Sequence, residues 1–97
     1  MATYVTLVRF TPQGIEGIKD SPKRAAKFCK AVKAAGGKVH QMLWTMGRYD
    51  GVVVYEAKND EAATALMLAV GRKGSAHTET LRAFDAKEFS AVLKQLG

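Results

Sequence analysis

The chain has 97 residues and a net charge of +6, and its content of 47% hydrophobic and 25% charged residues is that of one folded domain. No apolar run approaches the roughly 20 residues that span a bilayer, and the N-terminus alternates too strongly for a signal peptide. The single cysteine, Cys29, excludes an internal disulfide, and no Cys/His cluster has zinc spacing, so we expect a cytoplasmic protein without a metal site.

The first predicted element is a strand at about residues 3–10, where TYVTLVRF alternates along the chain. Thr11 and Pro12 can then cap a short helical turn, because a hydroxyl before a proline is a common helix start. This turn is expected to carry Ile15 and Ile18 inward.

A longer helix follows, with Ser21 as its capping hydroxyl and Pro22 at the first helical position. Its apolar stripe consists of Ala25, Phe28, Cys29, Val32 and Ala35, and Gly36-Gly37 ends it. Basic residues crowd the same region: Lys19, Lys23, Arg24, Lys27, Lys30, Lys33 and Lys38. They are typical of a solvated helix face, so this charge alone does not predict base recognition.

The second half of the chain begins with strands at about residues 38–46 and 51–57, which are expected to pair as an antiparallel hairpin because their connection is short. Asn59-Asp60 caps a second helix, which Gly74 closes. Residues 75–84 predict a fourth strand. Asp85 to Glu88 then matches a capping box, and the last helix has a clean apolar stripe: Phe89, Val92, Leu93 and Leu96.

This order predicts an α+β fold, the ferredoxin-like βαββαβ arrangement with a four-stranded antiparallel sheet, both crossover helices on one face, and a C-terminal helix. The other sheet face stays open. If Val5 and Leu7 point to the helices, the open face receives Tyr4, Thr6, Val8 and Phe10, and from the second strand His40, Met42 and Trp44. So apolar a face predicts a dimer that closes two sheets together, or a pocket roofed by the partner.

The hydrophobic strands of the hairpin meet at Gly47-Arg48-Tyr49-Asp50-Gly51. The glycines supply backbone freedom at a tight corner, and Asp50 can accept backbone N–H bonds that fix the turn. Alternatively, Tyr49 and Asp50 lie at the rim of the cavity, where a phenol donor and a carboxylate could bind or act on a ligand.

Two motifs carry a resemblance that covers essentially the whole chain: G-x-Y-D at residues 47–50 and T-E-T-L-R-A-F at residues 78–84. Together with Lys19-Asp20-Ser21-Pro22 and Gly36-Gly37, they make the sequence similar to the GYD domain family. The position before Thr78, arginine in that family, is His77 here. The resemblance implies a small bacterial protein of the dimeric α+β barrel kind, for which a cofactor-independent oxygenase or other small enzyme is one possible activity.

Individual residues give little support for catalysis. His40 and His77 are too few and too far apart to specify a metal, and Cys29 lies on an apolar stripe without neighbours that would activate it. Glu79 and Arg82 fall on opposite strand faces, so one of them faces the cavity or the interface. The candidate ligand-binding residues are Tyr4, Thr6, Phe10, His40, Met42, Trp44, Tyr49, Asp50, His77, Glu79 and Arg82.

The leading hypothesis is therefore a homodimer, or higher homo-oligomer, that binds a small organic molecule without a cofactor or a membrane. A structural or assembly protein is an alternative. An RNA binder is a further one, because Arg48, Gly51, Val53 and Tyr55 fit part of an RNA-recognition signature on the third strand. However, Tyr49, Asp50 and Val52 depart from that signature, so we expect no nucleic-acid partner.

Overall fold

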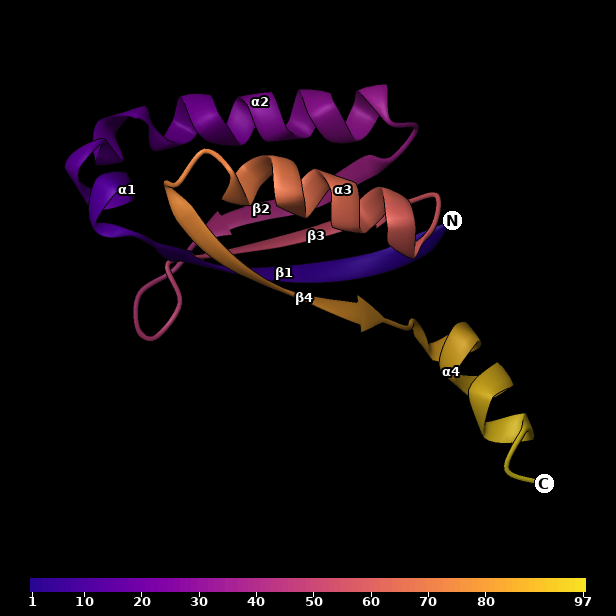
Figure 1. The fold of residues 1–97 in the computed structure, drawn as a ribbon. Coiled ribbons are helices and arrows are strands. Elements are labelled where there is room, and N and C mark those ends of the chain that lie inside the picture. The colour runs from indigo at the N-terminus through magenta and orange to yellow at the C-terminus, as the bar shows by residue number, and fades with distance from the viewer.

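The computed structural model describes residues 1–97 and places two helices on one face of a four-stranded sheet (Figure 1). The strands are β1 (Ala2–Phe10), β2 (Lys38–Trp44), β3 (Gly51–Ala57) and β4 (Ala76–Ala83). The helices are α1 (Pro12–Glu16), α2 (Ser21–Ala34), α3 (Asp60–Gly71) and α4 (Ala86–Lys94), with a 3₁₀ turn, η1, at Ile18–Asp20. Antiparallel neighbours in the order β2-β3-β1-β4 confirm the ferredoxin-like arrangement.

Most helices begin where their capping residues predict. The Thr11 hydroxyl accepts the Gly14 N–H, the Asn59 side chain accepts the Ala62 N–H, and Asp85 and Glu88 form a reciprocal capping box. Ser21 is the exception: it begins α2 but does not cap it, since its hydroxyl is buried and accepts a hydrogen bond from Trp44.

The predicted faces of β1 were wrong. Tyr4 and Thr6 face the helices and are 3% and 1% exposed, and Tyr4 stacks beside Tyr55 of β3 with ring centroids 5.8 Å apart. Val5 and Leu7 take the open face instead. Both faces of β1 are apolar, so alternation carries no polar side to distinguish them. The aromatic rings determine which face of β1 turns to the helices, because they fill the layer beneath them. There Phe28 of α2 packs edge-on against Tyr55.

The predicted face of β2 was also wrong for two of its three residues. A bulge interrupts the pairing of β2 with β3 between Val39 and Gln41, at His40. One extra residue reverses the parity beyond it, so Met42 and Trp44 lie on the helix side, while His40 stays on the open side. There His40 Nε2 lies 2.6 Å from the Glu56 carboxylate.

The turn of α1 is held tightly against the start of β4. A Cβ atom at Gly14 would lie 2.1 Å from the Ser75 carbonyl oxygen, so only glycine allows this approach. The Thr11 N–H and hydroxyl also bond to the carbonyls of Ser75 and Gly74. Ile15 and Ile18, expected inside, are exposed instead. This contact fixes one end of the space between helices and sheet.

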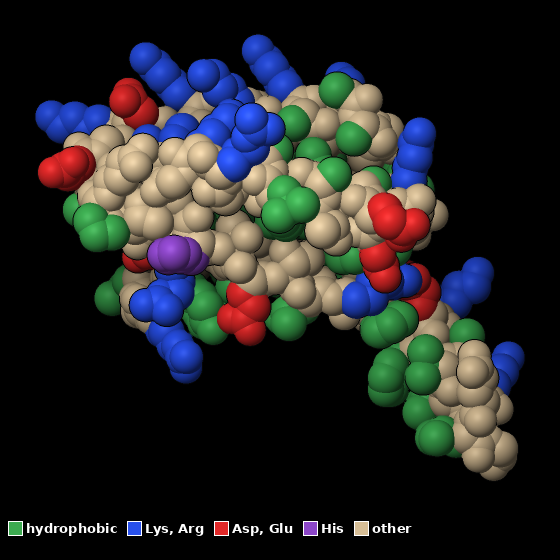
Figure 2. All heavy atoms as spheres, in the orientation of Figure 1, with side chains coloured by type: hydrophobic (Ala, Val, Ile, Leu, Met, Phe, Trp, Pro, Cys, Tyr) green, Lys and Arg blue, Asp and Glu red, His purple; other side chains and the backbone are tan.

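The sheet face opposite α2 and α3 is uncovered, and α4 stands apart from the body (Figure 1). Leu43 and Leu81 lie on this face by register and are about half exposed. The apolar side chains of α4 gather on the side turned toward the space below the sheet (Figure 2). We call the open sheet face and this stripe of α4 (Phe89, Val92, Leu93, Leu96) the lower surface. None of the helices has the length and apolar character to cross a membrane.

Candidate functional site

A cavity of about 400 Å³ lies between α2, α3 and the helix-facing side of the sheet. The two helices and the sheet each contribute residues to its lining. Its apolar lining includes Phe28 from α2, Leu66, Met67 and Val70 from α3, and Met42 and Val53 from the sheet. The cavity therefore lies within one chain, on the face opposite to the one that the sequence predicted.

The sheet side of the cavity carries the side chains of Thr78 and of the more deeply buried Thr6. The Thr6 hydroxyl lies 2.8 Å from the Thr80 hydroxyl and 3.2 Å from the Tyr55 hydroxyl. These partners satisfy Thr6 internally, as a buried hydroxyl requires. The deepest part of the floor, around Thr6, therefore offers no free polar group to a ligand.

Trp44 forms part of one end of the cavity and is half exposed. Its indole N–H donates to the Ser21 hydroxyl at 2.9 Å, which ties the last residue of β2 to the first turn of α2. The indole ring is thus held in a defined orientation at this end of the cavity. Phe10, at the end of β1, lines the same region.

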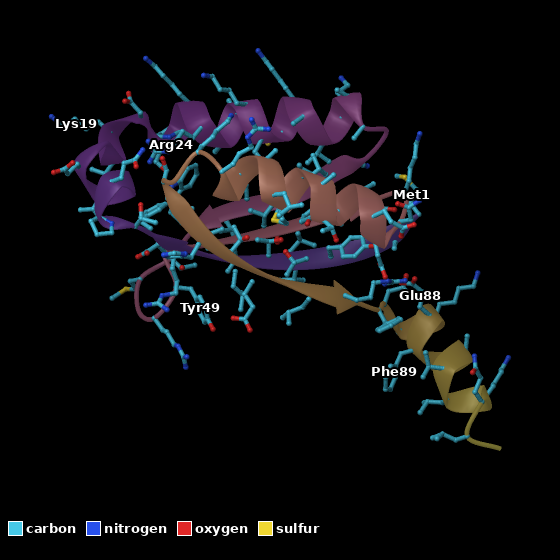
Figure 3. All side chains as sticks on the ribbon, viewed as in Figure 1. Met1, Lys19, Arg24, Tyr49, Glu88 and Phe89 are labelled. Carbon is cyan, nitrogen blue, oxygen red and sulfur yellow. The ribbon has the colours of Figure 1, made fainter.

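The same end of the cavity is cationic. Arg24, Lys27 and Lys73 line it, and no aspartate, glutamate, histidine or cysteine does. Arg24 lies near the start of α2 (Figure 3). Its guanidinium donates to the Gly17 carbonyl at 2.9 Å and to the Gly14 carbonyl at 3.5 Å, so α1 and η1 hold it in place.

The hairpin turn that contains the G-x-Y-D motif lies outside the cavity, below the sheet (Figure 3). Asp50 accepts the Phe10 N–H at 2.8 Å and donates its own N–H to the Val8 carbonyl at 2.7 Å. The Tyr49 hydroxyl donates to Glu79 at 3.1 Å, and Gly47 has a φ of 103°. Asp50 therefore does accept a backbone N–H, although from β1 and not from the turn itself.

The remaining candidates are scattered. His40 and His77 lie on β2 and β4, the two edge strands, so they do not converge within one chain. Arg82 lies over the rings of Tyr4 and Phe84 and pairs with Glu88 at 3.5 Å. Of the residues predicted for the site, the cavity brings together Thr6, Phe10, Met42 and Trp44.

Tyr4 lies under α3 and donates its hydroxyl to Asp60 at the start of that helix. Burial of the phenol, followed by this hydrogen bond and the charge of Asp60, raises the pKa of Tyr4 from 10.0 to about 12. The neutral phenol is thus the form that the fold selects. This contact joins the central strand to α3 and leaves Tyr4 out of the cavity lining.

Sequence reasoning missed the cationic end of the cavity. Arg24 was grouped with the solvated lysines of α2, yet it lies one residue before Ala25 and four before Phe28, so it borders the apolar stripe. Residues 21, 24, 25, 28 and 31 follow helical spacing and all line the cavity. That spacing was the available signal.

Comparison with known proteins extends the structural picture. A family model described as "GYD domain" matches residues 4–93. A Thermus thermophilus protein named "Glutamine synthetase and cystathionine beta-lyase binding protein" is 30% identical over 95 residues, which cover 97% of this chain and all of the relative. The crystal structure of TTHA0845 from Thermus thermophilus has the same fold, with a TM-score of 0.55 and 24% identity over 89% of this chain and 96% of that one. The chain therefore belongs to the GYD domain family.

Proposed function

We propose that this protein binds a small organic molecule in the cavity between α2, α3 and the sheet. The observation that carries the proposal is the cavity itself, an apolar hollow of about 400 Å³ with a few polar groups at one end. Ligand sites in proteins have this character and a volume of about 300–1,000 Å³. The volume lies near the lower limit, so the ligand is small.

The lining supports binding more than catalysis. Acid–base catalysis uses a group, most often an imidazole or a carboxylate, that can exchange a proton with the substrate. The cavity contains neither, and its hydroxyl groups lack a neighbouring base that would activate them. A cofactor-independent enzyme, the alternative that the family resemblance raised, has less support from these side chains.

We further propose that two copies associate through the lower surface. Leu43, Leu81 and the four apolar residues of the α4 stripe are between 41% and 81% exposed. Because large side chains offer about 150–250 Å² each, these residues expose on the order of 600 Å² per copy. Two copies would then bury an area within the roughly 1,200–2,000 Å² of stable interfaces. Each copy would keep a complete cavity on its far side.

A second copy fits this surface because one chain carries both halves of the contact. A bare sheet face that exposes Leu43 and Leu81, and an apolar helix stripe, both without a partner in the chain, can pack against one another across a two-fold axis. The helix α4 also has only nine residues, too few for stability in water without packing.

Native mass spectrometry of the purified protein tests the ligand proposal, because it detects bound small molecules by their mass. We expect a non-covalent organic adduct on the wild type. Ala25→Phe places a ring inside the cavity and should remove the adduct, whereas Ala26→Phe adds the same ring at an exposed, non-lining neighbour and should retain it. Equal adducts on both variants, or none on the wild type after incubation with a cell extract, would contradict the proposal.

A second candidate function is binding of a metabolic enzyme, which the name of the Thermus relative favours. The surface available for it is the outer side of α2, where basic side chains crowd together (Figure 2). It fits an acidic protein surface, because complementary charge steers association. Replacing Lys23, Lys30 and Lys33 together by glutamate should abolish capture of glutamine synthetase from the same organism in a pull-down. Unchanged capture would place the contact elsewhere, and no capture by the wild type would reject this candidate.

A further inference from the structure

We propose that the ligand of the cavity is an amphiphilic anion, with an apolar body and a single carboxylate or similar head group held at the Arg24 end. This inference rests on the proposed ligand-binding function and specifies the class of molecule that the cavity takes.

The distribution of charge along the cavity is the first support. Its three charged lining residues, Arg24, Lys27 and Lys73, are all cationic, and no carboxylate in the lining neutralises them. They also lie at one end. Gln13 of α1 donates to the Lys73 carbonyl at 3.3 Å, and Arg24 donates to two carbonyls of the segment from α1 to η1. The same short segment thus contacts the Arg24 side chain and the backbone of Lys73.

The state of the Arg24 side chain is the second support. A guanidinium has five N–H donors in a rigid fork that matches a carboxylate. Backbone carbonyls of Gly14 and Gly17 use two of them, and Arg24 has no carboxylate partner in the chain. The carbonyl contacts fix the orientation of the fork and leave donors free. Arg24 is therefore prepared to bind an anion without first losing an ion pair.

The opposite end of the cavity determines the chemical character of the rest of the ligand. Phe28, Leu66 and Met67 line it, and the Thr6 hydroxyl between them is already satisfied by Thr80 and Tyr55. A second polar group on the ligand would lose its water there without gaining a partner, which is unfavourable. A hydrocarbon tail or an aromatic ring meets no such cost, and methionine side chains adapt to its shape.

The experiment uses three probes with the same ten-carbon tail and different heads: decanoate, decanol and decyltrimethylammonium. Trp44 is the only tryptophan of the chain and lies at the cationic end, so its emission reports binding. We expect decanoate to bind the wild type about tenfold more tightly than decanol, because hydrogen bonds to charged groups are the stronger kind. The cationic probe should bind most weakly, and added salt should weaken decanoate alone.

Variants then assign the preference to Arg24. Arg24→Gln should weaken decanoate about tenfold while leaving decanol within about twofold. Lys30→Gln removes the same charge from an exposed site on α2 outside the cavity and should change neither probe. Because Arg24 also holds α1 and η1, the double variant Lys27→Gln with Lys73→Gln, whose side chains are exposed and bond to no carbonyl, provides an independent test and should weaken decanoate about threefold.

The outcomes separate the two proposals. Equal affinity of the wild type for decanoate and decanol, unchanged in both variants, would overturn the anionic head group and leave the cavity as a binding site. Tighter binding of the cationic probe would also overturn it. Failure of all three probes to alter Trp44 emission or to bind by calorimetry would overturn the cavity as a ligand site altogether.

Discussion

At the scale of single residues, the polar groups inside this small protein each have an identifiable partner. No buried side-chain nitrogen or oxygen lacks a hydrogen bond. Tyr4 with Asp60, Thr6 with Thr80, and Trp44 with Ser21 each join two different elements. Each such hydrogen bond adds little net free energy to folding, but breaking it would leave a buried polar group without a partner, which is costly. The contacts therefore favour one relative orientation of the elements that they join.

The Tyr4 contact makes the free energy of unfolding decrease as the pH rises into the alkaline range. Because the folded state raises the pKa of Tyr4 from 10.0 to about 12, its contribution is complete below pH 10 and is lost as the pH rises through 12. Tyr4→Phe keeps the ring and removes the ionisation, so its free energy of unfolding should fall less steeply over this range. Denaturant titrations at several pH values measure this, with Tyr49→Phe as the control. Parallel curves for wild type and Tyr4→Phe would contradict the assignment.

At the scale of elements, the sequence predicts well which helices and strands form and in what order. It predicts poorly which side of the sheet each strand residue faces. Caps at Thr11, Asn59 and Asp85 are local signals, readable within four residues, and each was confirmed. The faces of β1 and β2 depend on which side the helices cover, and no local signal encodes that. In β3, three consecutive valines at residues 52–54 leave the pattern uninformative.

The bulge at His40 shows how one residue moves a site. It turns Met42 and Trp44 to the helix side and leaves His40 on the open side. Without it, Trp44 could not reach Ser21 and one end of the cavity would lose its wall. Helical spacing could have placed Arg24 beside the apolar stripe of α2, but no local signal places Lys73 in the same cavity lining, because that depends on how α2 and α3 lie on the sheet.

The open face also bears on the RNA-binding alternative. Recognition of single-stranded RNA by a sheet of this topology requires aromatic rings on the exposed face. Tyr4 and Tyr55, the tyrosines of the two central strands, are 3% and 0% exposed and face the helices. On the open side those strands carry aliphatic residues such as Leu7 and Val54, which can pack against another protein but cannot stack on a nucleic-acid base.

At the scale of the whole molecule, the lower surface predicts the association state. Leu81→Glu on the sheet and Leu93→Glu on α4 each place a charge in the proposed contact, so each should weaken dimerisation about 30-fold or more. Leu68→Glu on α3, an equally apolar residue that is 68% exposed and lies outside the lower surface, should not. Sedimentation velocity over a concentration series measures the effect. A wild type that remains monomeric at the highest concentration would contradict the proposal.

Because α4 stands apart from the body, its stability depends on protein concentration if association provides its packing surface. The helix carries its own capping box and its own ion pair to Arg82, so it needs only a surface to lie on. If a second copy supplies that surface, only the associated form stabilises the last twelve residues of the chain, 86–97. By mass action the melting temperature then rises with protein concentration. In the cell, the fraction of chains in which this segment is ordered then depends on how much of the protein is made.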